Sequence, residues 1–533
     1  MATKATPDTT ADGAHADRQK TIALFVIAGA QLMIVLDATI VNIALPQMGD
    51  YFNVSSTTMT WALNAYTLAF GGLLLLGGKA GDLFGRKQMF QVGLGLFTLG
   101  SMMAGLAPNF AIMLAGRVVQ GVGGAIASPT ALSLIVTEFE EGPERTRAFG
   151  VFSAVSGGGA ALGLLLGGVL TDLLDWRWVF FVNLPIGIAL VYLASRYLHH
   201  SDRLEGKFDA IGGLMSTAGL FALVYGFIHA AESGWSEPLT IATLAVGVAL
   251  LAAFVYVETR VPEPMMPLSI FKDRNRTASY LIMLIVGAGM FGMFFFLTFF
   301  VQNVLGYSPL KSGFAFLPVA LGIGVSAQIA GQLLPRFGPK PLIVGGATLN
   351  TIGLLLLSRL DADSSYATHV LLPMVIVASG MGPIFVSVFT VAVSGLTREQ
   401  SGLGSALVNV MQQVGSSLGL SVLATVAGTA ARNFQSDHAG DVPALIERLT
   451  GQPVPAGAGG DLSQLPEPIR VQVQDLITRL SLEGGAHSAS SGFIAATCFA
   501  AAAIVAALVL ITMTKQQFLA AAEGQGGAPA HMG

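Results

Sequence analysis

The amino-acid sequence predicts an all-α polytopic membrane protein with fourteen transmembrane helices and both termini in the cytoplasm. Of its 533 residues, 53% are hydrophobic and only 11% are charged, whereas soluble domains carry about 25% charged residues. Apolar runs long enough to cross a bilayer, which takes about 20 residues, recur along the chain. A loop motif that occurs twice indicates a duplication. These three observations determine the predicted fold class.

The predicted spans fall into three sets, arranged as six, two and six. The first set covers 22–45, 58–78, 89–107, 110–136, 148–171 and 178–198, the central pair 210–230 and 238–257, and the last set 277–302, 312–334, 341–357, 369–393, 403–430 and 491–514. The predicted regions are a disordered cytoplasmic N-terminus (1–20), an N-terminal six-helix bundle (21–200), two linker helices with flanking loops (201–275), five helices of the C-terminal bundle (276–430), an extracytoplasmic loop with a helical hairpin (431–490), the last span (491–514) and a disordered cytoplasmic tail (515–533).

The distribution of basic residues supports this orientation. With both termini inside, most Lys and Arg residues at span ends lie on the cytoplasmic side, as the positive-inside rule requires. The outer side keeps only Arg177, Lys311, Arg359 and the basic residues of the 431–490 loop. The hairpin in that loop is expected to form a lid on the outer rim, in preference to a separate binding domain, because an amphipathic stretch occupies 467–480.

The duplicated motif follows the second and the tenth spans. The segments 78–87 (GKAGDLFGRK) and 331–340 (GQLLPRFGPK) share a glycine, a Phe-Gly pair and a final lysine at the same spacing. Such a pattern fits parallel repeats related by an axis along the membrane normal. In the first copy, Gly81 and Gly85 permit a tight turn and a close approach of helices.

The first copy of the motif also carries an acid. Asp82 can attract a helix N-terminus or the basic pair Arg145 and Arg147, and so latch the two halves together in the outward-facing state. The alternative is a plain positive-inside anchor, which explains the basic residues of the motif but not Asp82. The predicted gate residues are Gly78, Gly81, Asp82, Gly85, Arg86, Lys87, Arg145 and Arg147.

Asp37 is the main candidate for a functional residue, because it lies inside the first span. An ionisable group at that depth costs about 3 kcal/mol or more, and is a functional candidate for that reason. It lies eight residues before Leu45, about 12 Å from the outer end of the helix. Arg117 lies seven residues beyond Phe110 in the fourth span, at a similar depth.

A pair between Asp37 and Arg117, direct or through water, would offset the cost of both charges. Burial favours the protonated carboxyl group, whereas a neighbouring guanidinium favours the carboxylate. Such a balance would suit a group that loads and releases a proton. The alternative interpretation is a permanent salt bridge that only locks helices together.

Polar and aromatic residues inside the spans are candidates for a substrate cavity between the two halves. They are Asn42, Trp61, Asn64, Tyr66, Gln120, Phe294, Gln302, Asn303, Gln328, Asn409, Gln412 and Gln413. Aromatic walls suit flat lipophilic or cationic molecules. As a set, few acids and many aromatic rings favour amphipathic or neutral substrates over polyvalent cations. For each residue taken alone, packing or an interhelical hydrogen bond is an equal alternative.

In this order, the motifs resemble those of the major facilitator superfamily, specifically the fourteen-span drug:proton antiporters of the EmrB/QacA type. The resemblance rests on the segments 36–46 (LDATIVNIALP), 78–87, 117–125 (RVVQGVGGA), 176–187 (WRWVFFVNLPIG) and 300–309 (FVQNVLGYSP), and the continuation 125–130 (AIASPT) is similar to an EfpA-like subgroup. The resemblance covers nearly the whole chain. It implies a multi-pass protein of the bacterial cell membrane and a proton-coupled exporter that works by alternating access.

One motif departs from that family. Its antiporters usually carry Gly-Pro-x-x-Gly-Gly in the fifth span, and this chain has Leu164 in place of the proline. The expected kink is therefore missing, and export of a lipid or a specific metabolite stays open as an alternative. Small residues suited to close helix packing remain at Gly159, Gly163, Gly167 and Gly168.

Several other function classes are disfavoured. A net charge of −4 argues against nucleic acid as a partner, and a single cysteine excludes a disulfide framework or a thiolate zinc cluster. No phosphate-binding loop is present, so ATP is not the expected fuel. We expect no enzyme activity, cofactor or metal, and a monomer whose partners are substrates, protons and lipids. A channel or sensor is disfavoured because two repeats with a latch indicate rocking.

Overall fold

The computed structural model describes residues 9–140, 143–199, 209–261, 264, 266–396, 398–451 and 465–518. All regular elements within these residues are helical. The first half contains α1 (Thr9–Phe52), α2 (Ser56–Met59), α3 (Trp61–Phe84), α4 (Arg86–Gly105), α5 (Phe110–Glu138), α6 (Pro143–Leu173), α7 (Trp178–Phe181) and α8 (Asn183–Tyr197). The centre and second half contain α9 (Ala210–Ser233), α10 (Pro238–Glu258), η1 (Leu268–Lys272), α11 (Arg274–Phe299), η2 (Phe300–Val304), α12 (Pro309–Phe337), α13 (Pro339–Leu357), η3 (Tyr366–Leu371), α14 (Leu372–Val393), α15 (Arg398–Asp437), α16 (Asp441–Thr450) and α17 (Glu467–Leu510).

Each of the fourteen predicted spans coincides with a helix. Among the described residues, twelve helices are long and apolar enough to cross a membrane. The two predicted spans outside that set are α4, which begins with the polar residues Arg86, Lys87 and Gln88, and α6, whose apolar part is the shorter segment Gly158–Leu173. The all-helical membrane fold is confirmed, whereas the count of fourteen stays a prediction.

The two ends of the chain differ in part from the predicted disorder. Residues 1–8 and 519–533 lie outside the described part of the structure, but residues 9–20 belong to α1, and Lys515–Phe518 form a helical turn. The prediction of disorder was therefore wrong for 9–20. The helix continues there because the apolar run of the first span extends it, and because Lys20 donates a hydrogen bond to Glu144 at 3.0 Å.

The same set of helix pairs packs together in the first and second halves. Helix α1 packs on α6 as α11 packs on α15, and α4 packs on α5 as α13 packs on α14. The pairs α3 with α5 and α4 with α8 recur as α12 with α14 and α13 with α17. This arrangement is the one expected if two copies of a six-helix unit are related by an axis along the membrane normal.

The two copies of the sequence motif perform the same structural task. Gly85 and Gly338 have φ angles of 102° and 79°, a conformation that favours glycine, and each joins two antiparallel helices. In the first copy, Lys87 Nζ donates to the carbonyls of Ser195 and Leu198 at the end of α8. In the second copy, Lys340 Nζ donates to the carbonyl of Leu508 near the end of α17. Each lysine thus neutralises the negative end of the last helix of its half.

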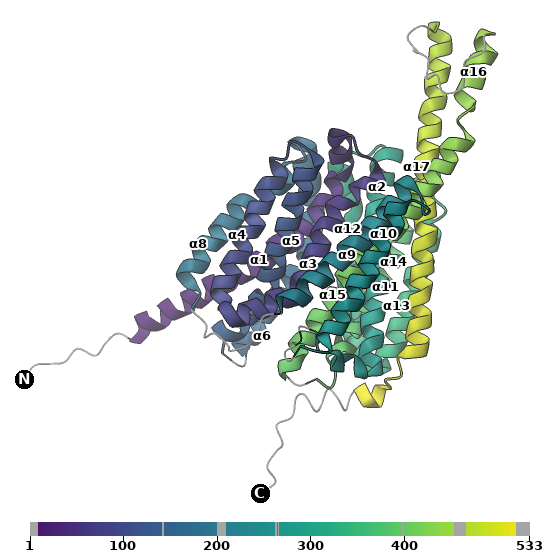
Figure 1. Ribbon diagram of the computed structural model, residues 1–533. Helices are drawn as coiled ribbons and strands as arrows, with labels where there is room; N and C mark the ends of the chain where they lie inside the picture. Colours follow the sequence, from purple (N-terminus) through teal and green to yellow (C-terminus); the bar gives the residue numbers. More distant parts are fainter. Residues whose placement is uncertain are drawn as a thin grey trace, which may run out of the picture.

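The two halves contact each other through α6 with α12 and through α15 with α3. Asn64 Nδ2 donates to Ser421 Oγ at 3.1 Å, and Gln302 Nε2 donates to the carbonyl of Ile43 at 2.9 Å. These contacts lie toward the end of the bundle opposite the termini, which we call the outer end, following the predicted orientation. In Figure 1 the two sets of helices approach each other at the outer end and diverge toward the end where both termini lie.

The central helices α9 and α10 pack against each other, and α9 also contacts α3 and α15. Thr425 on α15 donates to the carbonyl of Phe227 on α9 at 2.8 Å. The linker helix therefore bridges an element of the first half and an element of the second half.

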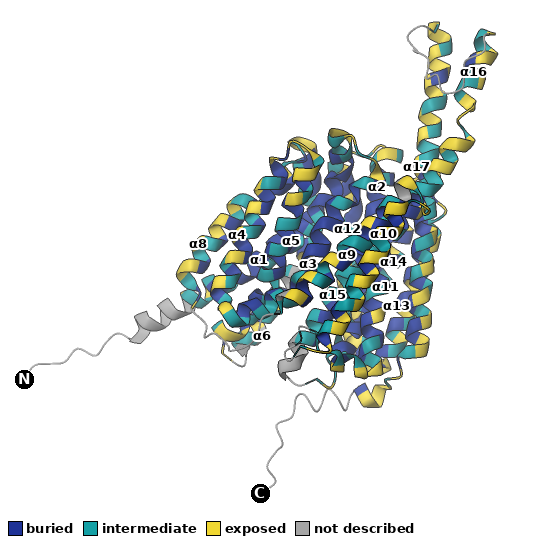
Figure 2. Cartoon of the chain, viewed as in Figure 1, coloured by how far each residue is buried: buried dark blue, intermediate teal, exposed yellow. Residues whose placement is uncertain are grey.

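The predicted hairpin forms from extensions of two spans. Helix α15 continues to Asp437 and is followed by α16, and α17 runs without a break from Glu467 to Leu510. The amphipathic stretch 467–480 is thus the first part of the last span. Figure 1 shows the hairpin standing away from the body, so it does not cover the outer rim as expected. Figure 2 shows that exposed residues predominate along it, whereas buried residues concentrate in the body.

Candidate functional site

Asp37 lies near the middle of the membrane-crossing part of α1, and its side chain is fully buried. Its Oδ2 atom accepts a hydrogen bond from Arg117 Nη1 of α5 at 2.6 Å, and the two residues form a direct ion pair. Its Oδ1 atom accepts from Gln120 Nε2 at 2.8 Å and from Asn183 Nδ2 at 2.9 Å. Four helices therefore converge on one carboxylate: α1 supplies the acid, α5 and α8 supply donors, and α4 supplies Ser101, which accepts from Gln120 at 2.7 Å.

The guanidinium of Arg117 is equally enclosed. Its Nε donates to the carbonyl of Ala62 at 2.8 Å, and Nη1 also donates to Gln120 Oε1 at 3.0 Å. The Tyr66 ring lies 4.5 Å and the Phe180 ring 5.9 Å from its central carbon. Aromatic faces attract a guanidinium, and the attraction grows when both are removed from water. The helices α1, α3, α5, α7 and α8 thus surround one ion pair.

This geometry satisfies both partners by direct contacts. The Asp37 carboxyl group accepts three hydrogen bonds, and neither side chain of the pair is exposed to solvent. Removing one partner of such a pair would leave a buried charge without compensation, which costs about 3–5 kcal/mol.

Two members of the cluster are absent from the residues predicted by sequence. Asn183 lies in the segment 176–187, which contributed to the family resemblance, and Ser101 is a polar residue in the apolar part of α4. Both are fully buried. Asn183 stands alone in the run VFFVNLPIG, and a lone amide in an apolar segment is a signal that could have identified it.

Three of the equivalent positions in the second half are apolar. Gly93 faces the carbonyl of Gly123 where α4 crosses α5, and Gly346 faces that of Gly380 where α13 crosses α14. The matching lysines and these matching glycine pairs align the two repeats. The residues that correspond to Ser101, Arg117 and Gln120 are then Leu354, Met374 and Val377, which are buried in one hydrophobic cluster.

The predicted latch residues all belong to the first half, at the end of α3, the start of α4 and the start of α6. Asp82 accepts a hydrogen bond from Arg86 at 3.1 Å. Arg145 donates to the carbonyls of Phe139 at 3.0 Å and Val136 at 2.9 Å, and the Arg147 side chain is exposed.

The predicted cavity residues divide by their surroundings. Asn64, Tyr66 and Gln120 are buried and contact protein groups, so they are closed to solvent in this conformation. Asn42 is buried as well, and its amide donates to the carbonyl of Ala38. The half-buried residues are Trp61, Phe294, Gln302, Asn409, Gln412 and Gln413, and the exposed ones are Asn303 and Gln328.

The small residues of α6 face other helices at close range. A Cβ atom at Gly167 would lie 2.7 Å from the carbonyl oxygen of Ile40 on α1, and one at Gly168 would lie 2.8 Å from that of Pro309 on α12. Gly163 faces Leu36 and Thr39, and Gly159 faces Leu32 and Val35. Leu164, which replaces the family's proline, is fully buried.

Two repeated helical units with a charge cluster buried in one of them define a polytopic membrane carrier. A family model described as Major Facilitator Superfamily matches residues 27–420. The chain belongs to that superfamily, which comprises transporters and not enzymes, and it is a multi-pass membrane protein whose bacterial relatives are cell-membrane proteins.

Similar proteins include several with names that refer to resistance or export. The puromycin resistance protein pur8 of Streptomyces alboniger is 44% identical over 81% of this chain and 86% of its own length. The MFS-type transporter EfpA of Mycobacterium tuberculosis is 37% identical over 76% of each chain. The cephamycin export protein CmcT of Amycolatopsis lactamdurans is 37% identical over 79% of this chain and 88% of its own.

The fold also resembles solved structures. A bacterial homologue of the human lysosomal transporter Spinster, in an inward-facing and unoccupied conformation, superposes with a TM-score of 0.61 at 15% identity. The match covers 94% of this chain and 98% of that one. The major facilitator fold predicted from the sequence is thereby confirmed.

Proposed function

We propose that this protein exports small lipophilic or amphipathic compounds of the antibiotic type by exchanging them for protons. The buried pair of Asp37 and Arg117 carries the proposal, because a carrier needs a group whose charge changes during its cycle. The names of the relatives, which refer to puromycin, cephamycin and multidrug resistance, support the substrate class.

The proposed cycle depends on opening the charge cluster. In the present conformation Arg117, Gln120 and Asn183 all donate to the Asp37 carboxylate. Protonation would remove the negative charge that Arg117 faces, weaken the attraction between α1 and α5, and let the first half change its shape. A proton crossing a potential of 100 mV releases about 2.3 kcal/mol, which supplies part of the free energy for uphill export.

We further propose that the 78–87 loop is a gate at the cytoplasmic end. Asp82 would exchange its present partner, Arg86, for Arg145 or Arg147 when the cytoplasmic ends of the halves approach each other. The helices of the two halves diverge at that end in Figure 1, which is the arrangement expected if the gate is open in this conformation.

The test is uptake of radiolabelled puromycin into inverted membrane vesicles under an imposed pH gradient, with and without an uncoupler. The parent protein should accumulate puromycin, and the uncoupler should abolish the accumulation. Asp37→Asn should lose uphill accumulation, whereas the matched control Asp361→Asn, at an exposed acid of an outer loop, should not. Uphill transport by the Asp37→Asn protein would show that this residue is not the coupling group. Cephamycin and lipophilic dyes would extend the panel.

A further inference from the structure

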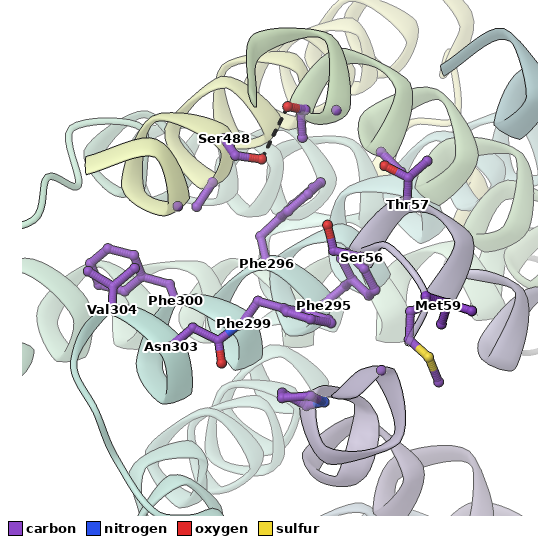
Figure 3. Close-up of a pocket in the computed structure, with 18 of the residues that line it drawn as sticks. Ser56, Thr57, Met59, Phe295, Phe296, Phe299, Phe300, Asn303, Val304 and Ser488 are labelled. Atoms are coloured by element: carbon purple, nitrogen blue, oxygen red, sulfur yellow. Dashed lines mark hydrogen bonds between the residues drawn. The ribbon is translucent and has the colours of Figure 1, made fainter. Parts of the chain in front are cut away.

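A cavity of about 240 Å³ lies at the outer end, where the two halves meet the base of the hairpin. Its walls come from the end of α1, from α2, from α11 and η2, and from α15 and α17. Figure 3 shows the side chains of Phe295, Phe296, Phe299 and Phe300 along one wall and Ser56 on another. The cavity is distinct from the Asp37 cluster, because the two share none of their residues.

The size and lining of the cavity indicate what it can bind. A cavity of about 150 Å³ accommodates benzene, so this one has room for a compound of about two fused rings. Four phenylalanine rings offer apolar contact and faces that attract cations. Among the described residues that line the cavity, Asp50 is the one charged side chain. The lining therefore carries a net negative charge and disfavours anions.

The local backbone gives a second indication. The chain forms a π-helical segment at Phe300–Val304, within the wall of the cavity, and π-helical turns occur frequently at functional sites. At the other side of the cavity, Ser488 of α17 donates to the carbonyl of Ala427 of α15 at 3.1 Å. This bond ties the base of the hairpin to the cavity wall.

We propose that this cavity is a binding site for small aromatic ammonium compounds that arrive from the outer side, and that an occupant holds the outer ends of the two halves together. A ligand that contacts α1 and α2 on one side and α11 on the other binds only while those elements are in contact. It therefore shifts the population toward the conformation with a closed outer end. The consequence is inhibition of export from outside; this consequence rests on the proposed function, whereas the site itself does not.

The test measures equilibrium binding of radiolabelled 1-naphthylmethylammonium to the full-length protein in nanodiscs, with empty nanodiscs as the blank. The parent protein should bind saturably. Ser56→Trp, at an exposed position whose new ring would fill the cavity, should abolish saturable binding. Phe299→Ala should weaken it about ten-fold, and Asp50→Asn about five-fold. The control Asp363→Asn, at an exposed outer acid away from the cavity, should bind like the parent.

A transport measurement completes the design. The same compound on the outer side should slow puromycin export by the parent protein but not by Ser56→Trp. Saturable binding that survives both Ser56→Trp and Phe299→Ala would place the compound elsewhere, such as on the substrate path, and overturn the proposal, as would no saturable binding to the parent. If Ser56→Trp does not fold, the affinities of the Phe299→Ala and Asp50→Asn proteins for the compound test the proposal instead. Failure to transport puromycin would refute the proposed function and leave the binding result intact.

Discussion

The first and second halves of this protein share their helix pairs but differ in what they bury. The first half encloses an acid, an arginine and three further polar side chains where α1, α4, α5 and α8 meet. At the positions that correspond to Ser101, Arg117 and Gln120, the second half has Leu354, Met374 and Val377. The comparison shows that backbone packing in this fold does not depend on the charge cluster. A cluster that the fold does not need is a candidate for function.

The largest loss of stability is expected from Arg117→Met. This substitution gives the first half the residue type that the second half has at the corresponding position, Met374. The Asp37 carboxylate would lose its cation inside an apolar bundle, at a cost of about 3–5 kcal/mol. Thermal unfolding of the purified protein would measure it. The matched control is Arg276→Met in the second half, where the buried guanidinium donates only to backbone carbonyls. An equal loss in both variants would contradict a special role for the ion pair.

A double substitution sharpens the same comparison. Asp37→Leu combined with Arg117→Met removes both charges and makes the first half resemble the second. Replacing a buried ion pair by apolar residues is often neutral or stabilising, so the double variant should recover about 2 kcal/mol relative to Arg117→Met alone. Transport should stay absent. A double variant that still accumulates puromycin would refute coupling through this pair.

A smaller loss of stability is expected from Asn183→Leu, because Asp37 keeps two of its three hydrogen-bond donors. One hydrogen bond to a buried charge contributes about 1.5–3 kcal/mol. The comparison variant is Asn350→Leu on α13 in the second half. Asn350 is also a buried amide, and its Oδ1 atom has no hydrogen-bond partner among the described residues. Denaturation midpoints of the two variants would provide the measurement, and a greater loss at Asn350 would contradict the ranking.

The repeated lysines allow a test outside the core. Lys87→Met should cost about 1–2 kcal/mol, because this side chain is buried and donates to two carbonyls. Lys340→Met should cost less than half as much, because the amine is more exposed and donates to one carbonyl. A fluorescence-based thermal shift assay, which monitors unfolding, would distinguish the two variants. Equal shifts would show that burial does not set the difference.

The smallest effects are expected at the two glycines with positive φ. Gly85→Ala should cost about 1 kcal/mol, the lower end of the strain expected for a residue other than glycine in a sparsely populated backbone region. Gly338→Ala should cost slightly more, since its Cβ atom would also lie 3.2 Å from Lys515 Cα, whereas at Gly85 the nearest atom is 3.7 Å away. Thermal shifts measured side by side would reveal the order, and a larger loss at Gly85 would reverse it.

The sequence by itself determined the membrane class, the approximate positions of the long apolar helices and the duplication. These features depend on local quantities, namely the apolar length of a segment, the distribution of basic residues and the spacing of a repeated motif. The same reasoning singled out Asp37 and Arg117, because the cost of a charge in a membrane is high wherever the helix points. It failed for residues 9–20, where α1 extends beyond the apolar run that predicted it, and for the position of the hairpin, which stands away from the body instead of covering the outer rim.

Only the tertiary structure decided which groups surround that charge. Asn183 donates to Asp37, and Ser101 accepts from Gln120 and Asn183, because of the way α8 and α4 are rotated about their axes. Sequence spacing within one helix does not specify its rotation relative to another. The outer cavity has the same origin, since its walls come from segments as distant as Asp50, Phe299 and Ser488. Local hydrophobicity fixes where a helix lies along the chain, but packing between helices fixes which side chains meet.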